Sequence, residues 1–281
     1  ELGTPEGWGT GPLALVDLDH DGFDDLVVSC STAYSAHAAC GDHDLVVVNG
    51  PLTRANDAPW AVIDNRRGGD LASAGVAIGD ATGDGFGDLL VVETMGDVGL
   101  GAVTVLDGID DASLDGGFGT VEAYATYEAE GVGSVAFASL SRVGDLDGDG
   151  LDDLVVADPE TGLGTVVVFY SPIPEVLGNA AADVTVLGDG GEEDGGGFGY
   201  SVAGAHDAEG AGRPLLLVGD PIHAGLLGSV YAMDLGEVVG AVEVDDVAVA
   251  RVDGGASDNP VGLRMSAGDV DGDGATDVVV G

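Results

Sequence analysis

An aspartate-rich motif of nine residues recurs four times in the sequence, at residues 17–25, 80–88, 145–153 and 269–277. Carboxylates occupy its first, fifth and ninth positions in every copy and its third position in three copies; the second copy has Thr82 there. The sixth position is always glycine, which permits the sharp turn that directs alternate side chains toward one point. Oxygen ligands at this density, without cysteine or histidine, favour Ca²⁺, which takes about 6–8 oxygens in irregular geometry.

Each motif is predicted to bind one Ca²⁺ ion through its side-chain oxygens and the main-chain carbonyl of its seventh residue. The predicted ligands of the first two sites are Asp17, Asp19, Asp21, Phe23, Asp25, Asp80, Thr82, Asp84, Phe86 and Asp88. The predicted ligands of the other two sites are Asp145, Asp147, Asp149, Leu151, Asp153, Asp269, Asp271, Asp273, Ala275 and Asp277.

The motif has two other possible interpretations. An EF-hand requires flanking helices and a bidentate glutamate at position twelve. Position twelve is valine in all four copies, inside β-branched runs, so an EF-hand is excluded. The plainer alternative is that the aspartates are solvated turns of an acidic protein, and four recurrences in one register argue against it.

A degenerate fifth copy of the motif lies at residues 205–213. It keeps acidic residues at the third and fifth positions but has Ala205 at the first position and Arg213 at the ninth. We expect this loop to bind no Ca²⁺, because the arginine can supply the positive charge itself.

The motif belongs to a longer repeat of about 60 residues, since its first three copies begin 63 and 65 residues apart and the last two complete copies lie 124 residues apart. Each unit has a small-residue apolar run before the loop and three β-rich runs after it, with Gly or Pro turns between them. This pattern predicts an all-β fold, a β-propeller of four-stranded blades. The predicted blades cover residues 1–70, 71–132, 133–195 and 196–257, with a partial blade at 258–281, so that residues 1–281 form one propeller segment of about four and a half blades.

The repeat resembles the FG-GAP repeat of integrin α-subunit heads and the related VCBS-type repeats of bacteria. The resemblance is carried by Phe198-Gly-Tyr-Ser-Val-Ala, by the aspartate loops, and by Gly219-Asp-Pro followed by Gly228-Ser-Val-Tyr, and it extends over essentially the whole chain. It implies a ring of seven blades, with Ca²⁺ held between the first and second strands of a blade. Four and a half blades cannot close such a ring, so we expect either a piece of a longer protein or completion by another chain.

The charge of the chain limits its partners. It carries 51 Asp and Glu against 7 Lys and Arg, a formal net charge of -44, and all seven cations are arginine. Nucleic acid and anionic membrane surfaces are excluded as natural partners because both require clustered basic residues. The absence of lysine excludes Schiff-base chemistry. No apolar run approaches the roughly 18–20 residues that span a bilayer, so direct membrane insertion is not expected.

Cysteine and histidine add little to the predicted chemistry. Cys30 and Cys40 are predicted to form a disulfide in an oxidising compartment, with two free thiols as the alternative. The five histidines lie in loops, and none has the spacing of a zinc site. His37 and His223 could in principle act as bases near neutral pH, but lone loop histidines are expected to be solvated. Residues 188–197 are interpreted as a flexible acidic connector.

The predicted function is a Ca²⁺-binding propeller outside the cell or on its surface, in a prokaryotic setting, that recognises a protein or a glycan in adhesion or assembly. A structural subunit of a filament or surface layer is the first alternative. A polysaccharide lyase or hydrolase is the second, and seven arginines among so many acids offer little attraction for an anionic substrate. We therefore expect no catalytic activity.

Overall fold

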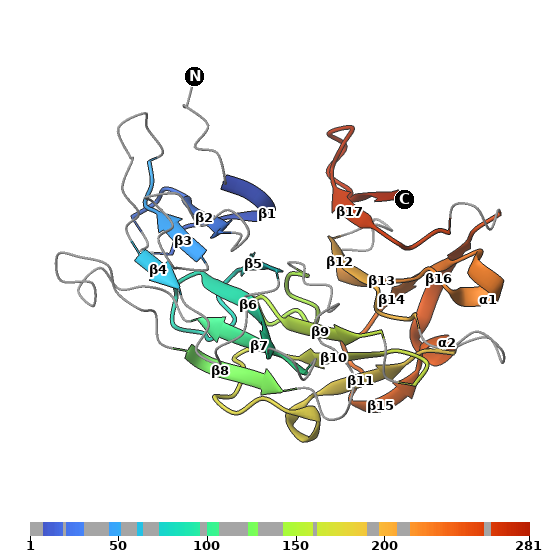
Figure 1. Cartoon of the computed structure of the whole chain (residues 1–281). Coiled ribbons are helices and arrows are strands. Elements are labelled where there is room, and N and C mark those ends of the chain that lie inside the picture. The colour runs from blue at the N-terminus through green and yellow to red at the C-terminus, as the bar shows by residue number, and fades with distance from the viewer. Residues whose placement is uncertain are drawn as a thin grey trace.

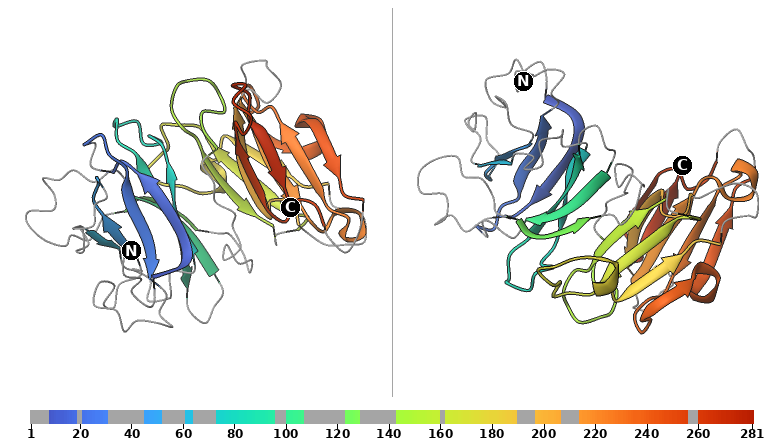
Figure 2. Two further views of the ribbon diagram at one scale, coloured as in Figure 1. Left: turned by 90° about the horizontal axis from the view of Figure 1, so that it is seen from above. Right: turned by 60° about the horizontal axis from the view of Figure 1, so that its bottom comes forward.

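The chain was described from a computed structural model, which places residues 8–18, 21–30, 45–51, 61–63, 73–95, 100–106, 123–128, 143–159, 162–189, 197–206, 214–255 and 260–281. Over these ranges the chain forms four sheets of four strands and one sheet of two strands. The sheets follow one another in chain order around an open arc (Figures 1 and 2). The predicted all-β architecture of small sheets is therefore confirmed.

Antiparallel pairing of strands that follow one another in the chain accounts for most of each sheet. The first two sheets contain β1 (Trp8–Val16), β2 (Asp25–Cys30), β3 (Leu45–Val48) and β4 (Ala61–Ile63), then β5 (Ser73–Ile78), β6 (Asp88–Met95), β7 (Leu100–Leu106) and β8 (Ala123–Glu128). The third sheet contains β9 (Leu154–Asp158), β10 (Thr165–Phe169), β11 (Val184–Leu187) and β15 (Gly240–Glu243). The fourth contains β12 (Ser201–His206), β13 (Pro214–Asp220), β14 (Ser229–Met233) and β16 (Ala248–Asp253), and β17 (Met265–Gly268) pairs with β18 (Asp277–Val280).

Helical structure in the described ranges is limited to single turns. They are η5 (Asn179–Ala181), α1 (His223–Leu226) and α2 (Val244–Val247). No helix in the described part of the chain is long and apolar enough to cross a membrane.

The first strand of a repeat lies on the concave side of the arc. Figure 1 shows β1, β5, β12 and β17 facing the open centre, while β4, β8 and β16 lie on the outer side. Three of the four aspartate loops lead from such a first strand into the second strand of their sheet, between β1 and β2, β5 and β6, and β17 and β18. The third loop leads into β9, the first described strand of its sheet, so every one of the four loops directly precedes a strand.

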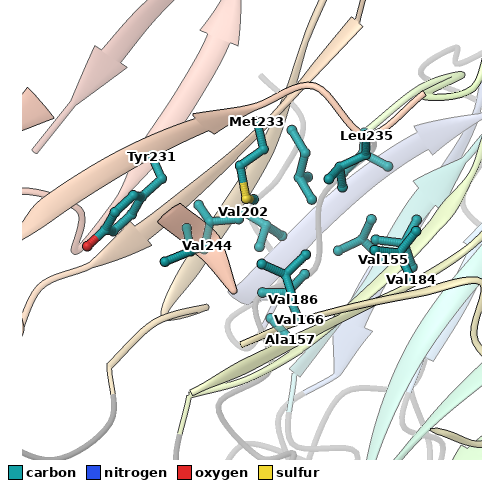
Figure 3. Packing of buried hydrophobic residues seen from close by; sticks show 14 of the residues in the cluster. Val155, Ala157, Val166, Val184, Val186, Val202, Tyr231, Met233, Leu235 and Val244 are labelled. Carbon is teal, nitrogen blue, oxygen red and sulfur yellow. The ribbon is translucent and has the colours of Figure 1, made fainter. Parts of the chain in front are cut away.

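The third sheet is buried on both faces, which explains its almost uninterrupted run of valines. Val155 and Val166 point into a core shared with the fourth sheet, in contact with residues such as Met233 (Figure 3). Their neighbours Val156 and Val167 point the opposite way, into a core shared with the second sheet. Because side chains alternate between the two faces of a strand, a sheet between two others needs apolar residues at consecutive positions.

The pairing of β15 was not anticipated from the sequence. This strand lies between β14 and β16 in the chain, yet it leaves the fourth sheet and pairs in parallel with β11 of the third, from Val184 opposite Gly240 to Leu187 opposite Glu243. Immediately after it, Val244 of α2 is fully buried in the core between the two sheets. The exchange covers the outer edge of β11 and ties the third and fourth sheets together by main-chain hydrogen bonds.

Several sequence predictions fall on residues outside the described ranges. They concern the predicted first strand of the third repeat at residues 134–139, most of the degenerate loop at residues 207–213, the ligand Asp19, and Cys40 of the expected disulfide. These predictions stand as they were made.

We expect Gly164→Ala to destabilise the chain by about 2 kcal/mol or more, because it disturbs the contact between the third and fourth repeats. Gly164 has a φ of 93°, and a Cβ there would lie 2.1 Å from the carbonyl oxygen of Phe198. Gly178 has extended backbone and open space around it, so Gly178→Ala is the control and should change stability by less than about 0.5 kcal/mol. Urea unfolding followed by circular dichroism measures both, and equal midpoints would contradict the role given to Gly164.

Candidate metal sites

The aspartate loops share one pattern of backbone hydrogen bonds. In the third loop the carboxylate of Asp145 accepts the N–H groups of residues 148–150 at 2.5, 3.1 and 2.9 Å. The same three bonds recur around Asp80 and Asp269, and two of them recur around Asp17. The first aspartate therefore shapes the turn around itself, and the four loops have matching local geometry.

The ninth aspartate connects each loop to the rest of its sheet. Asp153 is 1% exposed, and its Oδ2 accepts the N–H of Leu146 at 2.7 Å while its Oδ1 accepts the N–H of Ser171 at 2.9 Å. Asp25 makes the equivalent pair of bonds in the first sheet, where the second partner is the N–H of Gly50 at 2.7 Å. One carboxylate thus joins the loop to the connection that follows β3 in the first sheet and β10 in the third.

The other two copies show which part of this arrangement is constant. Oδ2 of Asp88, also fully buried, accepts the N–H groups of Ala81 and Thr82 at 2.7 and 2.9 Å. Asp277 accepts the N–H of Val270 at 2.9 Å but is exposed, since only two strands of its sheet are present among the described residues. The bond to the second residue of the loop is therefore common to all four copies, whereas burial depends on the following strands.

Two of the loops gather three carboxylates around one point. In the third loop, ligand atoms of Asp145, Asp147 and Asp153 lie within 4.8 Å of one another. In the fourth loop the corresponding group is formed by the first, third and fifth aspartates, residues 269, 271 and 273. Among the described residues, the first two loops do not gather three such side chains. The predicted ligand Asp149 lies outside the group in its loop, and its Oδ1 accepts the N–H of Leu151 at 2.8 Å.

The electrostatics of the third loop fit a bound cation. Burial raises the pKa of Asp153 to about 7, against the opposing effect of its two backbone donors. Burial also raises the pKa of Asp147, and the neighbouring charges of Asp149 and Asp145 add to the shift. Because burial and neighbouring charges disfavour the ionised forms of these carboxyl groups, a cation among them would stabilise the ionised forms. An all-oxygen donor set suits Ca²⁺. The residues of the third loop therefore fit the predicted Ca²⁺ ion, and a bound ion would stabilise the conformation of the loop.

Comparison with protein families locates one recognisable repeat in the chain. The FG-GAP repeat family matches residues 137–169, which include the third aspartate loop, β9 and β10. The predicted resemblance is therefore confirmed, and the chain contains an FG-GAP repeat, a family that typically binds Ca²⁺. A search of curated proteins found no match.

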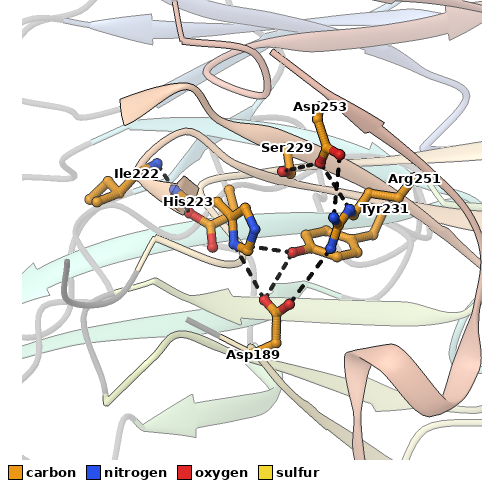
Figure 4. A network of polar contacts seen from close by, with 8 residues as sticks. Asp189, Ile222, His223, Ser229, Tyr231, Arg251 and Asp253 are labelled. Carbon is orange, nitrogen blue, oxygen red and sulfur yellow. Dashed lines mark hydrogen bonds and ion pairs between the residues drawn. The ribbon is translucent and has the colours of Figure 1, made fainter. Parts of the chain in front are cut away.

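A third group of possible ligands lies away from the aspartate loops and was missed from the sequence. It consists of Asp189, Asp220 and His223, whose ligand atoms lie within 4.8 Å of one another. Figure 4 shows Asp189 and His223 of this group facing each other. The expectation of a solvated His223 is wrong, because its side chain is 12% exposed and its Nδ1 lies 3.5 Å from Oδ1 of Asp189. Asp189 was assigned to a flexible connector, yet it also accepts the hydroxyl of Tyr231 at 2.9 Å.

The surroundings of this group are charged and well connected. Nε of Arg251 lies 2.8 Å from Oδ1 of Asp253, and the arginine also lies 5.8 Å from the centre of the Tyr231 ring. The hydroxyl of Ser229 donates to Asp253, and this bond together with the arginine lowers the pKa of that carboxyl. Burial raises the pKa of Tyr231, as does its hydrogen bond to Asp189. The spacing of His223 from Asp189 in the sequence gave no signal that they would meet, since the two residues come from adjacent sheets.

We expect Asp153→Ala to destabilise the chain by about 1–3 kcal/mol in EDTA, because the N–H groups of Leu146 and Ser171 lose their acceptor. Asp277→Ala removes the same position of the fourth loop at an exposed site and should cost less than about 0.5 kcal/mol. Chemical unfolding in metal-free buffer measures both variants. Equal stability of the two would show that the ninth aspartate acts only as a metal ligand.

Ca²⁺ binding to the third loop should release a proton near neutral pH. Because the pKa of Asp153 is raised to about 7 in the folded chain, this group favours folding at low pH when metal is absent, and that contribution is lost as the pH rises through 7. Ca²⁺ requires the carboxylate, so its affinity should run the opposite way and fall by about 30-fold from pH 8.5 to pH 5.5 at this loop. Calorimetric titration in buffers of different ionisation enthalpy counts the protons released. Asp153→Asn should abolish the release, and an unchanged proton count in that variant would contradict the assignment.

Proposed function

We propose that the chain is a segment of a Ca²⁺-stabilised β-propeller built from FG-GAP-type repeats. It would act outside the cell as a recognition or adhesion module for a protein or a glycan. The observation that carries the proposal is the recurrence of one aspartate loop, with matching hydrogen bonds, directly before a strand in four of the sheets. A loop repeated in this way is expected to have a structural role, because ligand recognition would require loops that differ from one another.

The arrangement of the sheets supports a propeller. Core residues on the two faces of the third sheet pack against the second and the fourth sheets, so the sheets stack face to face as propeller blades do. One face of the fourth sheet, including Ala203 and Leu217, packs in turn against Met265 and Ala267 of β17. Together with first strands on the concave side, this is the geometry expected of successive blades around a central axis.

Calcium is the cofactor that suits this role. A site with a dissociation constant of about 10⁻⁴ M, filled at ~1 mM Ca²⁺, contributes roughly 1.4 kcal/mol to folding stability. Several such sites together would supply an amount comparable with the net stability of a domain, about 5–15 kcal/mol. Free Ca²⁺ at this level is a property of the extracellular medium, which is why the proposal places the protein there.

The proposal assigns the chain a binding role and no catalytic one. The repeated groups are acceptors that hold loops and cations, and the strong negative charge favours partners with basic groups. A shallow cleft of about 230 Å³ beside the third loop has the carboxylates of Asp147, Asp234 and Glu237 in its lining. It offers one place where a positively charged group of such a partner could dock.

We expect EDTA to lower the melting temperature of the chain and Asp147→Asn to remove part of that effect. The amide oxygen of asparagine can still accept the N–H of Asp149, now 3.0 Å from Oδ1 of Asp147, so the loop itself should be kept. In EDTA the variant should match the wild type, while the stabilisation by ~1 mM Ca²⁺ should fall by roughly 1.4 kcal/mol, the share of one site. Differential scanning calorimetry provides both numbers. A wild-type melting point unmoved by EDTA would refute the structural role of calcium.

The recognition role is tested by binding to arrays of glycans and of extracellular proteins. Because the chain has no lysine, an amine-reactive dye labels only its amino terminus and leaves every side chain unmodified. We expect specific spots in ~1 mM Ca²⁺ that disappear in EDTA. Calcium-independent binding of equal strength would contradict the proposed dependence of recognition on the folded repeats.

A further inference from the structure

The polar group at the boundary of the third and fourth sheets combines a histidine nitrogen with carboxylate oxygens, whereas the aspartate loops supply oxygen ligands alone. Asp189 follows β11 of the third sheet, Asp220 ends β13 of the fourth, and His223 begins α1. The Nδ1 of His223 and Oδ1 of Asp189 are 3.5 Å apart. Two ligands that each lie about 2.0–2.1 Å from one tetrahedral ion are separated by roughly 3.3 Å, so this spacing is close to that of a shared metal.

The charged side chains of this group do not balance and leave an excess of two negative charges. When all three carboxyl groups are ionised, Asp189, Asp220 and Asp253 contribute three negative charges and Arg251 one positive charge, so that the sum with a neutral His223 is -2. Arg251 is held mainly by Asp253, whose two carboxylate oxygens lie 2.8 and 3.3 Å from its Nε and Nη2, and its Nη1 is 3.9 Å from Oδ2 of Asp189. Protonation of the histidine would remove one unit of the excess, whereas one divalent cation removes both.

Asp220 provides an independent indication of a missing partner. It is 1% exposed, and within the described part of the chain only its Oδ1 receives donors, the N–H groups of Ile222 and His223 at 3.1 and 3.0 Å. No side-chain cation of the described residues contacts it. A buried carboxylate with one unpaired oxygen is costly, and such groups in proteins are paired or bind metal.

We propose that Asp189, Asp220 and His223 form a second kind of metal site, which takes a divalent transition metal of the zinc class. One imidazole nitrogen and two carboxylate oxygens suit Zn²⁺, while Ca²⁺ and Mg²⁺ prefer oxygen alone. Three protein ligands leave a fourth position open to water. Tyr231 donates to Asp189 at 2.9 Å and holds the carboxylate toward the histidine (Figure 4).

A metal at this position would fasten two blades to each other. Asp189 belongs to the third repeat and the other two ligands to the fourth, close to the place where β15 crosses between the same two sheets. His223 and Asp189 are 12% and 19% exposed, so the ion can enter from solvent. The site would thus stabilise one particular boundary, in contrast to the aspartate loops, which act within each repeat.

The test is a titration of the metal-free chain with Zn²⁺ at about pH 7.5, in enough Ca²⁺ (~5 mM) to fill the aspartate loops. We expect one tightly bound Zn²⁺ and a rise in melting temperature. His223→Gln should weaken the binding by about 100-fold or more, while His206→Gln, an exposed histidine at the end of β12, should change it by less than about 2-fold. Circular dichroism without Zn²⁺ establishes that both variants are folded.

Co²⁺ in place of Zn²⁺ gives a readout that does not depend on stability. A nitrogen-containing tetrahedral site should produce visible absorption bands in the wild type that are lost in His223→Gln and reduced in Asp189→Asn. If His223→Gln does not fold, the Asp189 variant and the wild-type spectrum decide the matter. Absence of Zn²⁺ binding by the wild type, or equal binding by the wild type and His223→Gln, would overturn the proposal. Loss of Ca²⁺ binding would leave it intact, because the two sites share no residue.

Discussion

The buried carboxylate at the ninth position of the aspartate loop is the constraint on which the first three repeats depend. In the first and third sheets it accepts one N–H from its own loop and one from the connection after β3 or β10, as Asp153 does from Leu146 and Ser171. A buried carboxylate is costly unless its oxygens are satisfied, so burial and hydrogen bonding require each other here. In the third repeat, the loop, the start of β9 and the connection after β10 are thereby held in one geometry.

The second constraint is that a sheet within the arc has no solvent-facing side. Val166 and Val167 are neighbours in β10, yet they belong to different cores. Consecutive apolar residues are therefore needed along the strands, and the buried aspartates of the described residues, Asp25, Asp88, Asp153 and Asp220, lie at or next to the end of a strand. This explains how a chain with a net charge of -44 keeps 45% apolar residues and still forms well-packed cores.

Local sequence patterns predict the strands and the loops, but they do not predict contacts between segments that are distant in the sequence. The run Thr165–Phe169 follows a turn and is rich in β-branched residues, and it forms β10 as expected. The strand Gly240–Glu243 has no such signal, since it is short and mostly exposed, and its pairing with β11 joins residues of different repeats. His223 was interpreted as solvated for a similar reason, because the residue that contacts it, Asp189, lies in the preceding repeat. A repeat pattern predicts the features that the units share and does not predict the features in which they differ.

The two kinds of site show why this distinction matters for function. The aspartate loops are built from residues close together in the chain, so each repeat can hold its cation independently of its neighbours. The group around His223 requires two adjacent sheets to be in place, and any ion or proton that it takes up must stabilise their boundary. Loss of calcium should therefore loosen repeats one by one, whereas loss of charge balance at Asp189 and Asp220 should act on a single boundary. That boundary is also the one bridged by β15, so main-chain pairing and polar contacts reinforce each other between the third and fourth sheets.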